Sequence, residues 1–253
     1  CVTTNTMSFQ SYLNCRNYSF ILKLLGHTIF RPVYKLTQKL GISWFDFSRT
    51  LTKSLETNKV KGKFKDLYDE YCRESRDELF DSKKEAVEFY SKPKNYKALV
   101  NGDIGENLHA KYQAKTFLIL KSVFEAIFNV LKDDFNKKND PLTEIILSSS
   151  EKWLKNLYLI DAIMEKDLNT KDNYKLEIDF DFPEWLKKSD LPFNKFQKNT
   201  TYQLNYDFKK INYIKNEIKT VQGGDKERAL GRYLDRRNMI GFDLFEKRAS
   251  KIN

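Results

Sequence analysis

Apolar residues recur every three or four positions along most of this chain, and only 9 glycines and 5 prolines interrupt its 253 residues. That spacing places apolar side chains along one stripe of an α-helix. The first helix is predicted to begin after Ser8, which can cap it, and to end at Gly26. Further helices are predicted over four stretches, residues 28–41, 44–56, 61–80 and 82–92.

The longest helix is predicted after a turn at two glycines, from about Asn107 to Phe135, and another from Pro141 to about Glu165. The most apolar stretch, residues 117–131, carries Lys121, Glu125 and Asn129. It is also shorter than the roughly 20 residues that a membrane span requires. We therefore expect it to be a buried helix of the core.

Two short stretches alternate apolar and polar residues instead, residues 174–182 and 201–208. A period of two predicts strands with one buried face, and the two strands are expected to pair antiparallel. The predicted fold is mostly α, a multi-helix globular domain with one small antiparallel β-hairpin near the C-terminus. A helical body is expected over residues 1–170. The hairpin and C-terminal helices, residues 171–253, are expected to pack on it as one continuous domain.

The formal net charge of +10 raises the possibility of an anionic partner, since clustered Lys and Arg bind phosphates. Most of these charges are lysines scattered along the predicted helices, which is typical of solvated helix faces. Composition alone therefore favours a soluble, basic helical domain over a dedicated nucleic-acid or membrane-surface protein.

Three cysteines, Cys1, Cys15 and Cys72, form an odd set without any C-x-x-C pair. This favours a reducing compartment, the cytoplasm, over a disulfide scaffold. Cys1 also admits a second interpretation, the lipid-bearing first residue of a mature lipoprotein. Helical periodicity begins near Ser8, which leaves a short tether for that role, so the lipoprotein interpretation is less favoured.

Few residues in this chain have the spacing of a catalytic or metal site. Glu177, Asp179 and Asp181 alternate on one face of a predicted strand and could hold a divalent cation, but the solvated polar face of a half-buried strand is the favoured interpretation. His27 and His109 each lack the His or Cys partner at i,i+4 that a helical zinc site requires. No phosphate-binding glycine loop and no nucleophile elbow occurs. We predict no metal site and no catalytic residue.

Arginine is absent from the long stretch between Arg76 and Arg228 and then becomes frequent near the C-terminus. A final helix is predicted from Lys226 to Arg237. Four of its residues lie near one another on that helix: Arg228, Arg232, Asp235 and Arg236. One interpretation is an ion-pair network, with Arg228, Arg236 and Asp235 as members, that pins this helix to the body. The other is a contact with an anion or with nucleic acid.

Five separated stretches together resemble one family, in order along the chain. They are TNTMSFQSYLNCR (4–16), GISWFDF (41–47), FYSKPKNYKALVNGDIGENLHAKYQAK (89–115), DFDFPEWL (179–186) and ALGRYLDRRN (229–238). This pattern resembles the region downstream of the barrel in cobalamin-binding radical S-adenosylmethionine proteins. The resemblance covers nearly the whole chain.

The resemblance implies upstream domains that bind cobalamin and hold a [4Fe-4S] cluster on a C-x-x-x-C-x-x-C motif, where S-adenosylmethionine is cleaved. This chain contains neither that motif nor a glycine-rich cobalamin-binding half, so no cofactor is expected in it. We expect a C-terminal accessory domain, barrel-capping or substrate-side, that is not catalytic alone. It would begin just after the barrel, as a fragment or as half of a split pair. Its partners would be the upstream barrel and cobalamin domain, in the same or a split chain.

Within the stretches that carry the resemblance, four residues are candidates for the substrate side: Asn107, His109, Tyr112 and Arg232. The alternative function is a free-standing basic helical module that binds nucleic acid through its Arg-rich C-terminal helix. The two hypotheses differ in whether the C-terminal arginines stabilise the fold or face a phosphate backbone.

Overall fold

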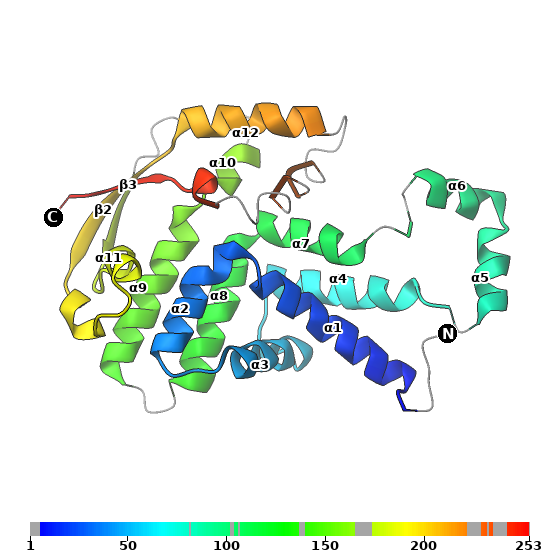
Figure 1. Cartoon of the computed structure of the whole chain (residues 1–253), viewed down its shortest axis with the longest axis horizontal. Helices are drawn as coiled ribbons and strands as arrows, with labels where there is room; N and C mark the ends of the chain where they lie inside the picture. The colour runs from blue at the N-terminus through cyan, green and yellow to red at the C-terminus, as the bar shows by residue number, and fades with distance from the viewer. Residues whose placement is uncertain are drawn as a thin grey trace.

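Helices form most of the molecule, and a small sheet lies at one end of it (Figure 1). The computed structural model describes residues 6–80, 82–101, 104–105, 107–136, 140–164, 174–221, 229–231, 233–234 and 242–252. Arg228, Arg232, Asp235 and Arg236 lie outside the described residues, so both interpretations of the C-terminal arginines remain predictions. Cys1 also lies outside them.

The elements fall into three groups along the chain. The first helices are α1 (Phe9–Leu25), η1 (Thr28–Phe30), α2 (Arg31–Lys39), α3 (Trp44–Glu56) and α4 (Lys63–Asp77). The middle group is α5 (Lys83–Tyr90), α6 (Pro93–Asn101), α7 (Leu108–Leu118), α8 (Leu120–Val130), η2 (Leu131–Phe135), α9 (Pro141–Leu157) and α10 (Ile160–Met164). The C-terminal group is β1 (Tyr174–Ile178), α11 (Phe182–Lys187), η3 (Phe193–Phe196), β2 (Thr200–Asn205), α12 (Phe208–Val221), η4 (Phe242–Phe245) and β3 (Arg248–Lys251).

Local capping signals confirm the predicted ends of the first helices. The Ser8 hydroxyl accepts a hydrogen bond from the backbone N–H of Ser11, and Ser43 does the same for Asp46 at the start of α3. Each bond satisfies an N–H that the helix itself leaves unpaired. Gly41 follows α2 with a φ of 71°, a left-handed conformation that favours glycine.

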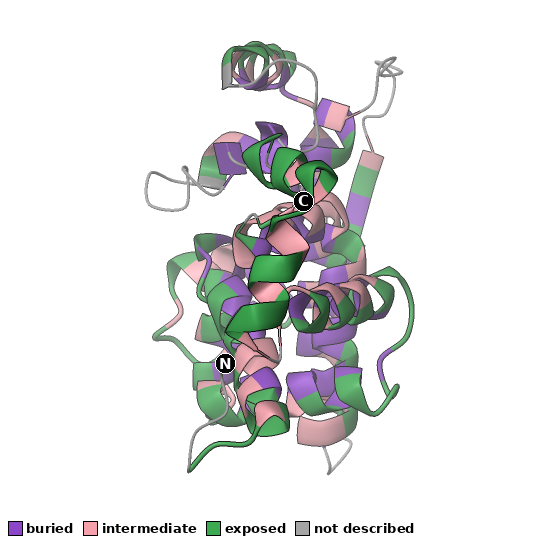
Figure 2. Ribbon diagram, turned by 90° about the vertical axis from the view of Figure 1, so that its right-hand side faces the viewer, coloured by how far each residue is buried: buried purple, intermediate pink, exposed green. Residues whose placement is uncertain are grey.

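Helix α8 lies at the centre of the core and packs against both α3 and α9. Val123, Phe124, Ile127 and Phe128 of α8 are fully buried, which confirms the prediction that residues 117–131 belong to the core. In Figure 2 most helices alternate buried with exposed positions, as expected of helices that each turn one face to a shared core. Within the part of the chain that the structure describes, no helix combines the length and apolar character needed to cross a membrane.

The predicted long helix from Asn107 to Phe135 is wrong as a single element. It breaks at Ile119, whose backbone leaves the helical region with φ −118° and ψ 30°. The hydroxyl of Thr116 donates to the carbonyl of Tyr112 at 2.6 Å, a local bond that bends helices. A second change comes after α8, where η2 is one turn of π-helix.

The predicted helix from Pro141 to Glu165 also breaks, at Tyr158. The backbone there is extended, and Tyr158 pairs with Glu246 in an isolated β-bridge. The N–H of Leu159 donates to the carbonyl of Phe245 at 2.7 Å. These backbone hydrogen bonds to the C-terminal segment take the place of the hydrogen bonds that would continue α9. A separate helix, α10, begins at Ile160.

The predicted antiparallel pairing is confirmed, with Leu176 opposite Tyr202. A third strand, β3, pairs with the other edge of β2 and was not predicted. The first strand ends at Ile178 rather than at residue 182, since the chain turns there into α11. The mostly helical fold with a small antiparallel sheet is therefore confirmed, with one strand more than expected.

Helices α5 and α6 project from one end of the molecule, beyond α4 and α7 (Figure 1). We call residues 82–101 the arm. Neither helix of the arm contains a buried residue, whereas α4 and α7, which lead to it, are each buried along one face.

Candidate functional site

The α4–α7 interface contains two of the predicted substrate-side residues, His109 and Tyr112, on successive turns of α7. Glu74 of α4 accepts a hydrogen bond from the Tyr112 hydroxyl at 2.5 Å and forms an ion pair with Lys111 at 2.6 Å. Farther along the interface, Lys115 pairs with Glu70 at 2.7 Å. Sequence spacing did not indicate this network, because its acidic members lie on a different helix from its basic ones.

Their surroundings shift the pKa values of Tyr112 and Glu74 in opposite directions. Burial raises the pKa of Tyr112 well above its usual range, and the neighbouring Glu74 carboxylate adds to that shift. Burial alone would raise the pKa of Glu74, but hydrogen bonds from Lys111 and Tyr112 outweigh it and hold that pKa below its usual range. The proton therefore stays on Tyr112 at neutral pH. This arrangement binds the two helices together and does not provide an acid–base pair.

His109 lies at the edge of this interface, half-buried beside two aromatic rings. Its ring centroid is 6.1 Å from that of Phe20 and 5.8 Å from that of Tyr71. Burial lowers the pKa of His109, and the charges of Lys23 and Arg16 lower it further. The imidazole is therefore neutral near pH 7, a form that can accept one hydrogen bond.

The side chain of Asn107 caps a helix. Its side-chain Oδ1 accepts a hydrogen bond from the N–H of Ala110 at 3.2 Å, which makes it the N-cap of α7. The structure thus brings His109 and Tyr112 to one interface and assigns Asn107 to helix capping. Arg232, the fourth substrate-side candidate, lies outside the described residues.

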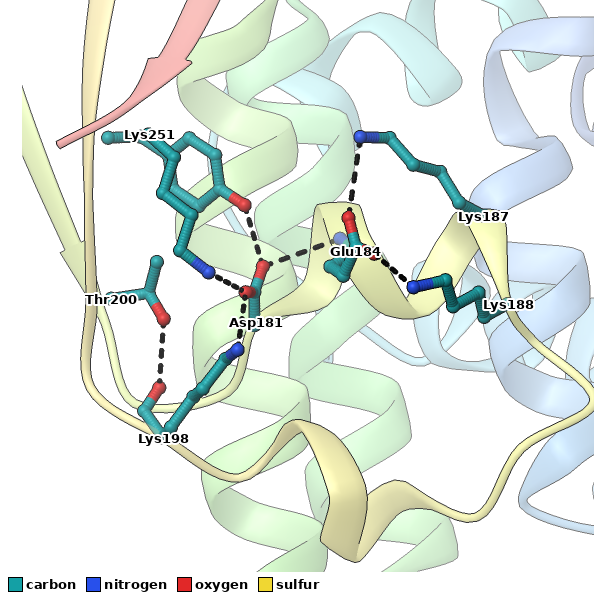
Figure 3. Close-up of polar contacts among 8 residues, drawn as sticks. Asp181, Glu184, Lys187, Lys188, Lys198, Thr200 and Lys251 are labelled. Carbon is teal, nitrogen blue, oxygen red and sulfur yellow. Dashed lines mark hydrogen bonds and ion pairs between the residues drawn. The ribbon is translucent and has the colours of Figure 1, made fainter. Parts of the chain in front are cut away.

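A second polar cluster, centred on Asp181, was not predicted (Figure 3). The Asp181 carboxylate is fully buried and accepts bonds from the Tyr202 hydroxyl at 2.7 Å and from Lys251 at 2.6 Å. It also caps α11 through the N–H of Glu184. The sequence signal was present: an acidic residue before Phe-Pro and three positions ahead of a Glu is typical of a helix start.

The expectation that Glu177, Asp179 and Asp181 share one wet strand face is therefore wrong for Asp181. Glu177 and Asp179 are exposed, but the strand ends at Ile178 and the turn into α11 directs Asp181 inward. Lys251, with Lys198 at 3.7 Å, supplies the positive charge that a buried carboxylate needs. The cluster fixes the end of β3 against the start of α11.

The cysteines that the structure describes do not suit an iron–sulfur cluster, which requires several thiolates converging on one point. Cys15 is exposed on α1, while Cys72 is half-buried on α4. Burial raises the pKa of Cys72 to about 11, so it remains a thiol at neutral pH. Within the described ranges, no three or more His, Cys, Asp or Glu side chains come together in a group that could hold a metal ion.

Two of the stretches that carry the family resemblance meet in the structure. Gly231, from ALGRYLDRRN, packs on Ala114 of α7, from GENLHAKYQAK. The contact is so close that a Cβ on Gly231 would lie 1.9 Å from the Cβ of Ala114. Comparisons of the chain with protein-family models, with curated proteins and with solved structures found no match.

Proposed function

We propose that this chain is an accessory domain, barrel-capping or substrate-side, of a cobalamin-type radical S-adenosylmethionine enzyme, and that it docks through its arm. The family assignment comes from the sequence resemblance. The observation that carries the docking is the pair of helices α5 and α6, which bury none of their own residues in the chain. We expect the protein to work in the cytoplasm, where its cysteines stay reduced.

The arm exposes large apolar side chains on both of its helices. Val87 is 55% exposed, Tyr96 60% and Val100 68%. Tyr96 and Val100 lie one turn apart on the same face of α6, and neighbouring exposed apolar residues are a common mark of a protein interface. Around them the arm carries five lysines and two glutamates, a net charge of +3. The matching partner surface is an apolar patch with an acidic rim, and we assign it to the barrel.

The position of the arm supports the same proposal. The longest stretch of family resemblance, residues 89–115, starts at the end of α5 and runs through α6 into α7. His109 follows the arm on the first turn of α7 and remains partly exposed. A partner held by the arm would therefore lie close to a neutral imidazole. The domain would cover the open end of the barrel and exclude water from the reaction there.

The proposal predicts that the chain alone has no radical chemistry. After anaerobic reconstitution with iron and sulfide, the purified chain should show no cluster chromophore and form no 5′-deoxyadenosine from S-adenosylmethionine. Chromatographic measurement of 5′-deoxyadenosine checks this. A robust yield from the chain alone would contradict an accessory role.

Docking is tested separately, with a protein of the same genome that carries the C-x-x-x-C-x-x-C motif and the barrel. The double variant Tyr96→Ser/Val100→Ser should weaken binding at least tenfold, because each change removes an apolar contact from the centre of the interface. The matched control is Tyr34→Ser/Tyr213→Ser, which changes exposed tyrosines on α2 and α12. Calorimetry of both variants decides, and equal losses would exclude the arm as the docking site.

A further inference from the structure

A cavity of about 420 Å³ lies beside the π-helical turn η2, at the end of α8. Its apolar wall comes from three places along the chain: Leu40 and Ile42 after α2, Leu131 and Phe135 of η2, and Leu147 of α9. That volume is within the range of small-molecule sites, which are mostly apolar with a few polar groups. The cavity shares no residue with the arm.

The π-turn forms one side of this cavity. The N–H of Asn136 donates to the carbonyl of Leu131 at 3.1 Å, five residues back, where an α-helix would use the carbonyl four residues back. Single π-turns are rare and occur frequently at functional sites. Here the wider turn places both Phe135 and Asp134 along the cavity.

Four polar residues line the cavity, and three of them, Asn136, Asp140 and Thr143, hydrogen-bond to one another at the start of α9. The Asp140 carboxylate accepts bonds from the backbone and hydroxyl of Thr143 at 2.8 Å and 2.6 Å. The Asn136 side-chain oxygen accepts from the N–H of Asp140 at 3.1 Å. Both contacts stabilise the start of α9. The Asn136 oxygen is engaged and Asp140 is exposed, so neither residue offers a buried, free acceptor to a ligand.

Asp134 differs from these two. Its Oδ1 pairs with Lys59 at 2.7 Å, but its Oδ2 is buried without a hydrogen-bond partner among the described residues. A buried carboxylate oxygen without a donor is costly. The terminal torsion of an aspartate turns freely enough to direct this oxygen to a donor in the cavity. Among the described charged residues at the cavity, Asp134 and Asp140 carry two negative charges against the one positive charge of Lys59, which favours a cationic donor.

We propose that this cavity binds an amphiphilic primary amine, with its ammonium group on Asp134 Oδ2 and its apolar body against Leu131, Phe135 and Leu147. The carboxylate supplies the selectivity for a cation, and the apolar wall supplies most of the affinity. Affinity should rise roughly three- to fourfold for each added methylene that the wall covers.

Methyl NMR of the full chain tests the proposal with three probes of equal length: hexylamine, hexan-1-ol and hexanoate. Hexylamine should shift the methyl signals of Ile42, Leu131 and Leu147 and bind at least tenfold more tightly than hexanoate. Butylamine should bind more weakly than hexylamine. Equal affinity for the amine and the carboxylate, or no shift at these methyl groups, would overturn the proposal.

The variant Asp134→Asn should weaken hexylamine at least tenfold and leave hexan-1-ol nearly unchanged. Asp133→Asn is the matched control, since it removes the same charge from an exposed neighbour on the same turn. Lys59→Met provides a second test that keeps the carboxylate and frees its Oδ1, so hexylamine should bind more tightly. Equal effects of the two Asp→Asn variants on hexylamine, or weaker amine binding in Lys59→Met, would contradict a role for Asp134.

Discussion

Asp181 has a buried carboxylate whose partners come from distant parts of the chain: Tyr202 on β2 and Lys251 on β3. Asp181→Asn keeps the size of the side chain but removes its charge. We expect the free energy of unfolding to fall by about 1–3 kcal/mol, since Lys251 loses its counter-charge. Denaturant unfolding measures this. Asp179→Asn, an exposed change two residues earlier, should cost less than about 0.5 kcal/mol.

The same residue predicts a pH dependence. Burial alone would raise the pKa of Asp181, but bonds from Lys251 and Tyr202 outweigh it and hold the folded-state pKa below the usual value. In the unfolded chain that pKa is about 3.9. The contribution of Asp181 to stability is therefore complete above about pH 4 and is lost as the pH falls through the lower folded-state pKa.

Unfolding followed from pH 6 to pH 2 should show a shallower loss of stability for Asp181→Asn than for the natural chain. An identical slope in both would mean that Asp181 is not held as a charged group.

Gly231 is predicted to be intolerant of any side chain. In Gly231→Ala the new Cβ would meet the Cβ of Ala114 at 1.9 Å, so the two segments must move apart. We expect a loss of about 1–3 kcal/mol in the free energy of unfolding. Gly26→Ala is the control, because its new Cβ would meet only two backbone carbonyl oxygens, at 3.3 Å and 3.5 Å.

A double variant gives the decisive comparison for this contact. Adding Ala114→Gly to Gly231→Ala restores the space, so the pair should be less destabilised than the sum of the single changes. Simple additivity would show that the close approach of Gly231 and Ala114 does not control stability.

At the scale of elements, helix starts were predictable because their signals are local. Ser8, Ser43 and Asn107 each cap a helix three residues from the N–H that they bind. The helix break at Tyr158 was not predictable, because its cause is a backbone pairing with Glu246, far along the chain. Strand β3 was not predicted for a related reason. Its residues are all exposed and show no clear alternation of apolar and polar side chains, so only its pairing with β2 identifies it as a strand.

The candidate site follows the same rule. His109 and Tyr112 could be selected by their place in a stretch of family resemblance, but the Glu74 that holds Tyr112 lies on another helix. The cavity at η2 joins three separate segments, and its π-turn leaves no simple periodic signal. The helices themselves could thus be predicted from the sequence, whereas the contacts between them could not.

The arm contributes little to the core, so changes to its side chains should hardly affect stability. Because α5 and α6 bury no residue, Tyr96→Ser/Val100→Ser should change the free energy of unfolding by less than about 0.5 kcal/mol. Thermal or denaturant unfolding of the variant checks this. A loss above about 2 kcal/mol would mean that these side chains support the body rather than a partner.

At the scale of the whole molecule, the arm differs in physical character from the rest of the described chain, which is here called the body. The body buries a continuous core around α8, while the arm exposes apolar side chains that no described residue covers. A helix stabilised by few tertiary contacts opens readily. The arm should therefore exchange its backbone amide hydrogens much faster than α8 does, until a partner covers it.

Hydrogen–deuterium exchange with and without the barrel-bearing partner shows whether the arm is the docking element. We predict that residues 83–101 of the arm exchange rapidly in the free chain and become protected in the complex, and that Tyr96→Ser/Val100→Ser removes this protection. A complex that forms without protection of the arm, or no complex at micromolar concentrations, would contradict the account.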